Sequence, residues 1–264
     1  MASILDRYGI KEVADVTFYT IDEATGNADV PVLYLDSLKV STIEQTAETV
    51  YAQGGKGNPR LIGWDFGKEI TLSLEDALFS PKSMAVMFGN GKVENTATGY
   101  AIKKTVTAVA STGSISAKWT DAKGDLHEEK NFNVYSENGE LVGKVASGAF
   151  SGEGEKTLVA GTRYFCTFDV KVAGQEIVVG PNTFPGTYYI TGDTYARSEV
   201  TGEDDYFQFI IPKGKITSEN TITMEAEGDP SVFNLNVDVL RANLDGEQVM
   251  MKLVKYDLAA AAAE

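Results

Sequence analysis

Apolar and polar residues alternate with a period of two along most of the chain. In the run 69–75, Ile70, Leu72 and Leu74 alternate with polar side chains, as in a strand that buries one face. Similar runs recur between turn-forming residues, at 13–21, 32–40, 60–66, 101–110, 114–119, 163–172, 175–180, 187–196, 206–212, 220–227, 231–240 and 248–258. The pattern predicts an all-β fold, an antiparallel sandwich or barrel.

One segment departs from this alternation and predicts a short helix near residues 81–88. Ser80 can cap the helix, and Pro81 suits the first helical position because a proline there leaves no hydrogen bond unmade. Apolar residues then recur at a spacing of three and four, and Gly89 permits a left-handed exit. We expect this helix to lie on a sheet.

Two polar tips, 53–60 and 197–205, stand in similar surroundings in the two halves of the sequence. Each follows a Tyr-Ala pair and precedes an apolar strand. The likeness is short. It can be explained by an internal duplication or by coincidence. In both halves we expect a long hairpin that extends beyond the core.

The length and composition suit a protein with a large core. The chain has 264 residues and 43% hydrophobic residues, which is enough for one large all-β domain or for two smaller ones. The stretch 120–157 is poorer in apolar residues and richer in glycine and charge than its flanks. We therefore expect a single domain over residues 1–264, with an inserted elaboration at about 120–157.

The charge balance and the absence of long apolar runs exclude several classes of protein. Lys and Arg number 23 against 38 Asp and Glu, so the formal net charge is -15. Such a surface repels nucleic acid. No run approaches 18 apolar residues, and the first residues carry charges where a signal peptide is apolar. We expect no membrane anchor and synthesis in a cytoplasm.

The residues that could carry catalysis are few. Cys166 is the only cysteine, so we expect a small buried thiol, and His127 is the only histidine, which we expect in a solvated loop. The glycine-rich stretches 54–60 and 151–157 lack the pattern of a phosphate-binding loop. The acidic run 203–205 suits a solvated hairpin tip better than a calcium site. We therefore expect no enzyme activity, no cofactor and no bound metal.

Three segments resemble the tube-forming major tail proteins of tailed bacteriophages. They are TAETVYAQGGKGNPRLIGWDF at 46–66, GKEITLSLEDALFSPKSMAVMFG at 67–89 and NTITMEAEGDPSVFNLNVDVL at 220–240. The resemblance implies a β fold of the tail tube type and a structural virion protein, assembled in the host cytoplasm. Its subunits would form hexameric rings that stack into a hollow tube for DNA ejection. The implied partners are other copies of the chain, the tape measure protein, the tail terminator and the baseplate or tip proteins, with DNA only in transit.

The resemblance also implies candidate assembly residues. The polar tip within the first segment is the candidate loop for stacking one ring on the next. It comprises Gln53, Gly54, Gly55, Lys56, Gly57, Asn58, Pro59 and Arg60. Glu44 and Glu48 share the polar face of the preceding strand with Thr42 and Thr46, and we expect these acids to face the lumen. A negative wall suits passing DNA, because cationic contacts would bind its phosphates.

Two other readings stay open. A capsid decoration protein, or another phage structural protein, could share this acidic all-β composition but would not need long inter-subunit hairpins. A carbohydrate-binding β module is favoured by Trp64, Trp119 and the tyrosines of 187–195. These aromatics fall mostly in alternating strand patterns, so we expect them in the core or in interfaces.

Overall fold

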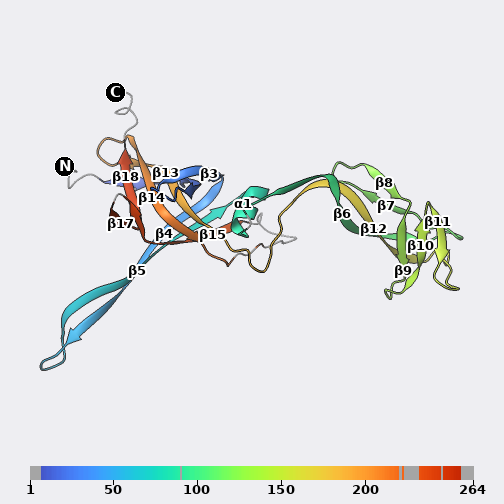
Figure 1. Cartoon of the computed structure of the whole chain (residues 1–264), viewed down its shortest axis with the longest axis horizontal. Coiled ribbons are helices and arrows are strands. Elements are labelled where there is room, and N and C mark those ends of the chain that lie inside the picture. Colours follow the sequence, from blue (N-terminus) through green and yellow to red (C-terminus); the bar gives the residue numbers. More distant parts are fainter. Residues whose placement is uncertain (1–6, 90, 220–221, 223–231, 245, 257–264) are drawn as a thin grey trace. The chain divides into compact units, whose positions relative to one another are not determined.

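The computed structural model describes residues 7–256 except 90, 220–221, 223–231 and 245, and it confirms an all-β fold (Figure 1). All of the described strand pairs are antiparallel. The chain divides into two compact units. The first comprises residues Met1–Val93 and Ile177–Glu264, and the second comprises Glu94–Glu176.

The first unit is built on one large sheet and carries the predicted helix. Its elements are β1 (Tyr8–Ile10), β2 (Asp15–Ile21), β3 (Ala28–Leu35), β4 (Leu38–Gln53), β5 (Arg60–Asp76), α1 (Pro81–Met87), β13 (Thr187–Ser198), β14 (Asp204–Ile216), β15 (Phe233–Val239), β16 (Ala242–Leu244), β17 (Glu247–Val249) and β18 (Lys252–Tyr256). In the described part of the chain the sheet has the order β3-β2-β13-β14-β15-β5-β4. β1 also pairs with β13, and β18 with β14. Strands β16 and β17 form a separate pair.

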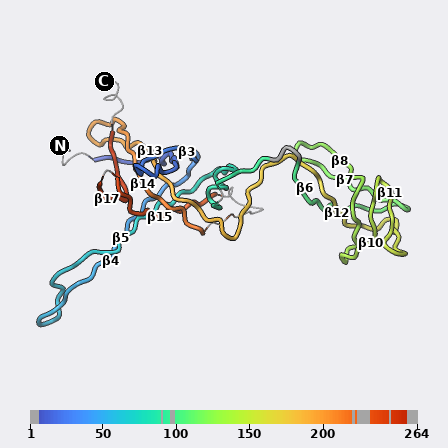
Figure 2. Tube along the Cα trace, viewed as in Figure 1, coloured from blue at the N-terminus to red at the C-terminus, as the bar shows by residue number. Residues whose placement is uncertain are grey.

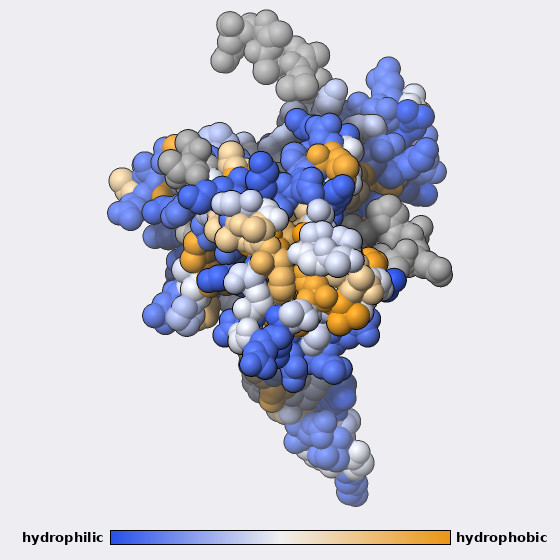
Figure 3. All heavy atoms as spheres, turned by 90° about the vertical axis from the view of Figure 1, so that its right-hand side faces the viewer, coloured by the Kyte–Doolittle hydropathy of each residue, from blue (hydrophilic) through white to orange (hydrophobic). Residues whose placement is uncertain are grey.

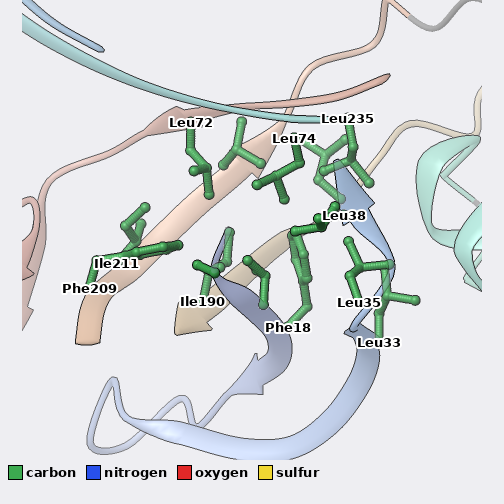
Figure 4. Close-up of a cluster of buried hydrophobic side chains, with 14 of the residues drawn as sticks. Phe18, Leu33, Leu35, Leu38, Leu72, Leu74, Ile190, Phe209, Ile211 and Leu235 are labelled. Atoms are coloured by element: carbon green, nitrogen blue, oxygen red, sulfur yellow. The ribbon is translucent and has the colours of Figure 1, made fainter. Parts of the chain in front are cut away.

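The core of this unit lies on the strand faces that the alternation predicts. Leu72 and Leu74 of β5 are buried, with exposed fractions of 0% and 1%. Figure 4 shows their side chains directed toward those of Phe18 and Ile190, which come from other strands of the sheet. Burying this many aliphatic and aromatic side chains is the main favourable contribution to folding.

Helix α1 begins and ends where the sequence predicts. The Ser80 hydroxyl accepts a hydrogen bond from the Ser83 backbone N–H at 3.0 Å, and the Ser83 hydroxyl accepts one from the Ser80 N–H at 2.8 Å. Pro81 occupies the first helical position. Gly89 has φ +91°, and a Cβ there would collide with the Phe184 backbone. Glycine is therefore required at this exit.

The strand boundaries differ from the expectation at several places. Residues 60–66 and 69–75 form one 17-residue strand, β5, because a bulge at Gly67 (φ +61°) joins them without breaking the pairing with β4. Residues 177–180 lie outside the strands. The tip 197–205 does not extend beyond the core, since β1 and β18 pair beside it. The strand expected at 220–227 lies, except for Ile222, outside the described residues, as does the terminal alanine run.

The second unit has its own sheet and its own core. Its strands are β6 (Glu94–Val109), β7 (Ala117–Thr120), β8 (Leu126–Glu129), β9 (Phe132–Tyr135), β10 (Leu141–Ala146), β11 (Ala149–Gly152) and β12 (Arg163–Glu176). The sheet order is β11-β10-β9-β12-β6, and β7 pairs with β8. Buried residues such as Ala117, Val134 and Phe168 form the core. The stretch 120–157, where we expect an elaboration, lies inside this unit.

Cys166 is buried as expected, with no exposed surface, and desolvation raises the pKa of its thiol to about 11. Glu94, the first residue of the unit, pairs with Glu176, its last residue. The chain therefore enters and leaves this unit through neighbouring strands.

Candidate functional site

The most distinctive feature of the first unit is the hairpin formed by β4 and β5, which extends well beyond the core (Figures 1 and 2). Within the described chain, β4 pairs only with β5, and β15 pairs with β5 only between Thr71 and Asp76. The outer part of the hairpin is therefore a two-stranded ribbon. An isolated ribbon of this kind is marginally stable in water, so it gains from a covering partner.

The candidate stacking loop forms the tip of this hairpin, and its backbone is tightly turned. Gly55, Gly57 and Asn58 all have positive φ, between 51° and 86°. The Gly54 N–H donates to the Pro59 carbonyl at 3.3 Å, and the Asn58 side-chain amide donates to the side-chain oxygen of Gln53 at 3.1 Å. Figure 3 shows hydrophilic residues over this end of the hairpin, the lowest projection in that view. The tip is thus an ordered polar surface.

One face of the ribbon behind the tip has internal partners. The Arg60 guanidinium lies over the Tyr51 ring, 4.2 Å from its centroid. The Thr49 hydroxyl donates to the Asp65 carboxylate at 2.6 Å. Cation–π contacts and charge-assisted hydrogen bonds of this kind hold the two strands in register.

The other face carries the two candidate lumen acids and then becomes apolar. Cross-strand pairs place Glu44 opposite Thr71 and Glu48 opposite Phe66, and both acids are exposed. The next pairs are Val50 with Trp64 and Ala52 with Ile62. We call Val50, Ile62, Trp64 and Phe66 the apolar hairpin face. Their exposed fractions are 52%, 55%, 54% and 48%.

Sequence reasoning identified the polar tip and the acids but missed the apolar hairpin face. Trp64 was expected in the core or in an interface, and in the single copy it is exposed. The signal was present in RLIGWDF, which has apolar residues at adjacent positions as well as alternating ones. Such a run is too apolar for a ribbon that water surrounds on both faces.

A groove of about 720 Å³ lies at the base of the same hairpin. Its apolar lining includes Ile10, Val40 and Leu253, which are 66%, 43% and 70% exposed. Lys11 and Lys39 also line it. Neither lysine has an ion-pair partner among the residues that the structure describes. The groove is therefore apolar with cationic groups beside it.

A third lysine of the groove, Lys255, is already paired. Its ammonium group donates to the Tyr8 hydroxyl at 2.6 Å and lies 2.8 Å from the Asp205 carboxylate. These contacts raise the pKa of Lys255 and lower the pKa of Asp205. Because the pair is satisfied within the chain, Lys11 and Lys39 are the cations that an incoming group would meet.

Two residues of the acidic run 203–205 form ion pairs. Asp204 accepts two hydrogen bonds from the Arg197 guanidinium, at 2.7 and 2.8 Å, and this contact lowers the pKa of Asp204. Asp205 pairs with Lys255. Throughout the described chain, no group of three His, Cys, Asp or Glu side chains is placed to hold a metal ion.

The only histidine lies in β8 of the second unit, not in the solvated loop that the sequence suggested. The ring of His127 stacks on Trp119 with a centroid distance of 4.4 Å, and its Nε2 lies 3.1 Å from the Asp121 carboxylate. The Lys104 ammonium also lies over the Trp119 ring, at 4.2 Å. Neighbours in the chain thus occupy this indole, which leaves little open surface for stacking a sugar.

Comparisons with known proteins identify the kind of molecule. Residues 8–253 match the YomU/Tube protein family. No curated protein matches the chain significantly. In the described residues, no helix has the length and apolar character needed to cross a membrane.

Proposed function

The chain belongs to the YomU/Tube protein family, a phage tail tube family, and from that premise we propose that it is the major tail protein, forming stacked hexameric rings. Family membership makes it a structural virion component that self-assembles into a tube with other tail proteins. The finer proposal is that the stacked rings form the conduit through which DNA is ejected. The tape measure, tail terminator and baseplate or tip proteins would be its partners inside the tube and at its two ends.

The observation that carries this proposal is the exposed hairpin of β4 and β5. It leaves four large apolar side chains half exposed and ends in an ordered polar tip. A single copy gains nothing from such an extension, whereas a neighbouring copy could cover it. Among the described strands, β3 and β4 are the edges of the large sheet, and such edges can pair with neighbours.

Within this assembly we assign two roles to the hairpin. The tip, residues 53–60, would contact the next ring, where its polar groups would meet polar partners. Glu44 and Glu48 would face the lumen. Their carboxylates are exposed and have no ion-pair partner among the described residues, so they would repel the phosphates of passing DNA.

Electron microscopy of the purified full-length protein tests the proposal. Concentrated samples should contain hollow tubes, and end views should average to six-fold symmetry. Analytical ultracentrifugation of the same samples should show large assemblies that grow with concentration. A protein that stays monomeric at every concentration, also when mixed with phage tail tips, would contradict the proposal. Discrete closed oligomers without tubes would favour a capsid decoration protein.

A further inference from the structure

We propose that the groove at the base of the β4–β5 hairpin in one copy receives the apolar hairpin face of another copy. The groove is the one lined by Ile10, Val40 and Leu253, with Lys11 and Lys39 beside it. The occupant is Val50, Ile62, Trp64 and Phe66 of the second copy. This inference rests on the proposed self-assembly and names the surface on which the hairpin docks.

The groove and the hairpin face of one chain are kept apart by the strand that connects them. Val40 lines the groove, and Val50 lies ten residues further along the same strand, β4. At about 3.3 Å per residue the two positions are separated by roughly 33 Å. Because β4 runs on with β5 as a ribbon, the hairpin points away from its own groove. Another copy must supply the occupant.

The two surfaces match in apolar character. Both expose aliphatic or aromatic side chains: Leu253 and Ile10 of the groove are 70% and 66% exposed, and Trp64 of the hairpin is 54% exposed. Aromatic side chains that enter an apolar hollow contribute much of the affinity of an interface. Contact between the surfaces would remove both apolar areas from water at once.

The two surfaces also match in charge. The charged residues that line the groove are three lysines, Lys11, Lys39 and Lys255, and one acid, Glu12. On the hairpin, Glu69 lies opposite Thr46, on the same face as Val50 and Trp64. In a chain whose net charge is -15, a groove with unpaired lysines is unusual. Complementary charge of this kind fixes register and speeds association more than it adds affinity.

The arrangement has a consequence for symmetry. Groove and hairpin face are different surfaces, so their contact is heterologous, with each copy both giving and receiving a hairpin. Heterologous contacts generate closed rings or continuing filaments, not isolated pairs. A tube needs contacts of this type.

Disulfide trapping between two variants tests the contact directly. Val50→Cys protein is mixed with Leu253→Cys protein, allowed to assemble, and oxidised. The native Cys166 is buried, so it contributes little background. The expected result is a covalent dimer of the two variants. The matched control replaces Val50→Cys with Val109→Cys, an exposed position in the second unit. A dimer yield no higher than in this control would overturn the inference.

Charge reversal provides a second test. Lys11→Glu with Lys39→Glu should raise the protein concentration needed for assembly by at least about tenfold. Adding Glu69→Lys to the same chain should recover part of that loss. The control pair Lys144→Glu and Lys171→Glu, both exposed on the second unit, should leave assembly unchanged. Normal assembly of the groove variant would overturn the inference.

The two proposals fail in distinguishable ways. If the unchanged protein forms no tubes, the proposed function fails. If it forms tubes but neither the trapped dimer nor the charge effect is found, only the groove assignment fails, and the hairpin docks elsewhere on its neighbour.

Discussion

Glu48 of β4 lies directly opposite Phe66 of β5, at the point where one face of the hairpin changes from carboxylates to apolar side chains. On the side toward the core this face carries Glu44, opposite Thr71. On the side toward the tip, the next pair is Val50 with Trp64. This face is therefore acidic at its end near the core and apolar at its end near the tip, as the proposed lumen and subunit contacts require.

Reversing the charge of the candidate lumen acids should give the tube affinity for DNA. We expect Glu44→Lys and Glu48→Lys, singly and together, to leave the fold intact, since exposed charges contribute about 0–1 kcal/mol. Because every subunit of a ring would carry the new lysine, the lumen would gain a ring of positive charges that binds DNA phosphates by counterion release. The measurement is DNA binding by assembled tubes at low and moderate salt. Should the double variant not assemble, Glu44→Lys alone is measured. Assembled tubes that bind no DNA at low salt would show that these acids face elsewhere.

Shortening the hairpin tip should stop stacking without unfolding the protein. Gln53 and Arg60 are cross-strand partners in the structure. Replacing Gly54–Pro59 by Asn-Gly therefore connects them through a two-residue hairpin turn. Circular dichroism should be unchanged, because the Gly54 N–H and the Asn58 side-chain amide donate within the tip, to Pro59 and Gln53. We expect rings but no long tubes in electron micrographs. Tubes of normal length would remove the stacking role from residues 53–60.

Placing a charge on the buried face of β5 should unfold the first unit. Leu72→Asp buries a carboxylate that has no partner, at a cost of ~3–5 kcal/mol. Ser73→Asp, the next residue on the exposed face, serves as the control and should change stability by at most about 0.5 kcal/mol. Thermal unfolding followed by circular dichroism compares the two. Equal midpoints would show that the two faces of β5 are assigned the wrong way round.

The ion pair of Asp204 with Arg197 should make stability depend on acid pH. The Arg197 guanidinium lowers the folded-state pKa of Asp204 below its ordinary value of 3.8. The contribution of this pair is therefore complete above pH 3.8 and is lost as the pH falls through the lower, folded-state pKa. Asp204→Asn should melt at a lower temperature than the unchanged protein at pH 7, and the gap should close below pH 3.8. Glu203→Gln is the matched control, and an equal pH profile for both variants would contradict the assignment.

The sequence predicts those parts of the fold that local rules decide. Ser80, Pro81 and Gly89 define the helix ends because capping and left-handed exits depend on single residues. Leu72 and Leu74 mark the core face because a period of two is set by strand geometry. The expectation that the strand is interrupted between residues 66 and 69 was wrong, because a glycine bulge can keep two runs in one strand.

Features that depend on residues far apart in the chain could not be predicted from the sequence. The groove brings together residues from β1, β4, β14 and β18, which lie far apart in the sequence. The alternation around Trp64 fits both a buried strand and a ribbon without neighbours, and only the adjacent apolar residues of RLIGWDF distinguish the two. The register of β4 with β5, which sets Glu48 opposite Phe66, also depends on where the bulge falls.

The pairing of Glu94 with Glu176 has a consequence for how such a chain can diversify. A segment whose two ends meet can be gained, lost or exchanged in a single genetic event, and the strands on either side keep their order. For the same reason the junction is a natural place to graft a foreign module. A particle made of many copies would then carry one such module for every copy of the chain.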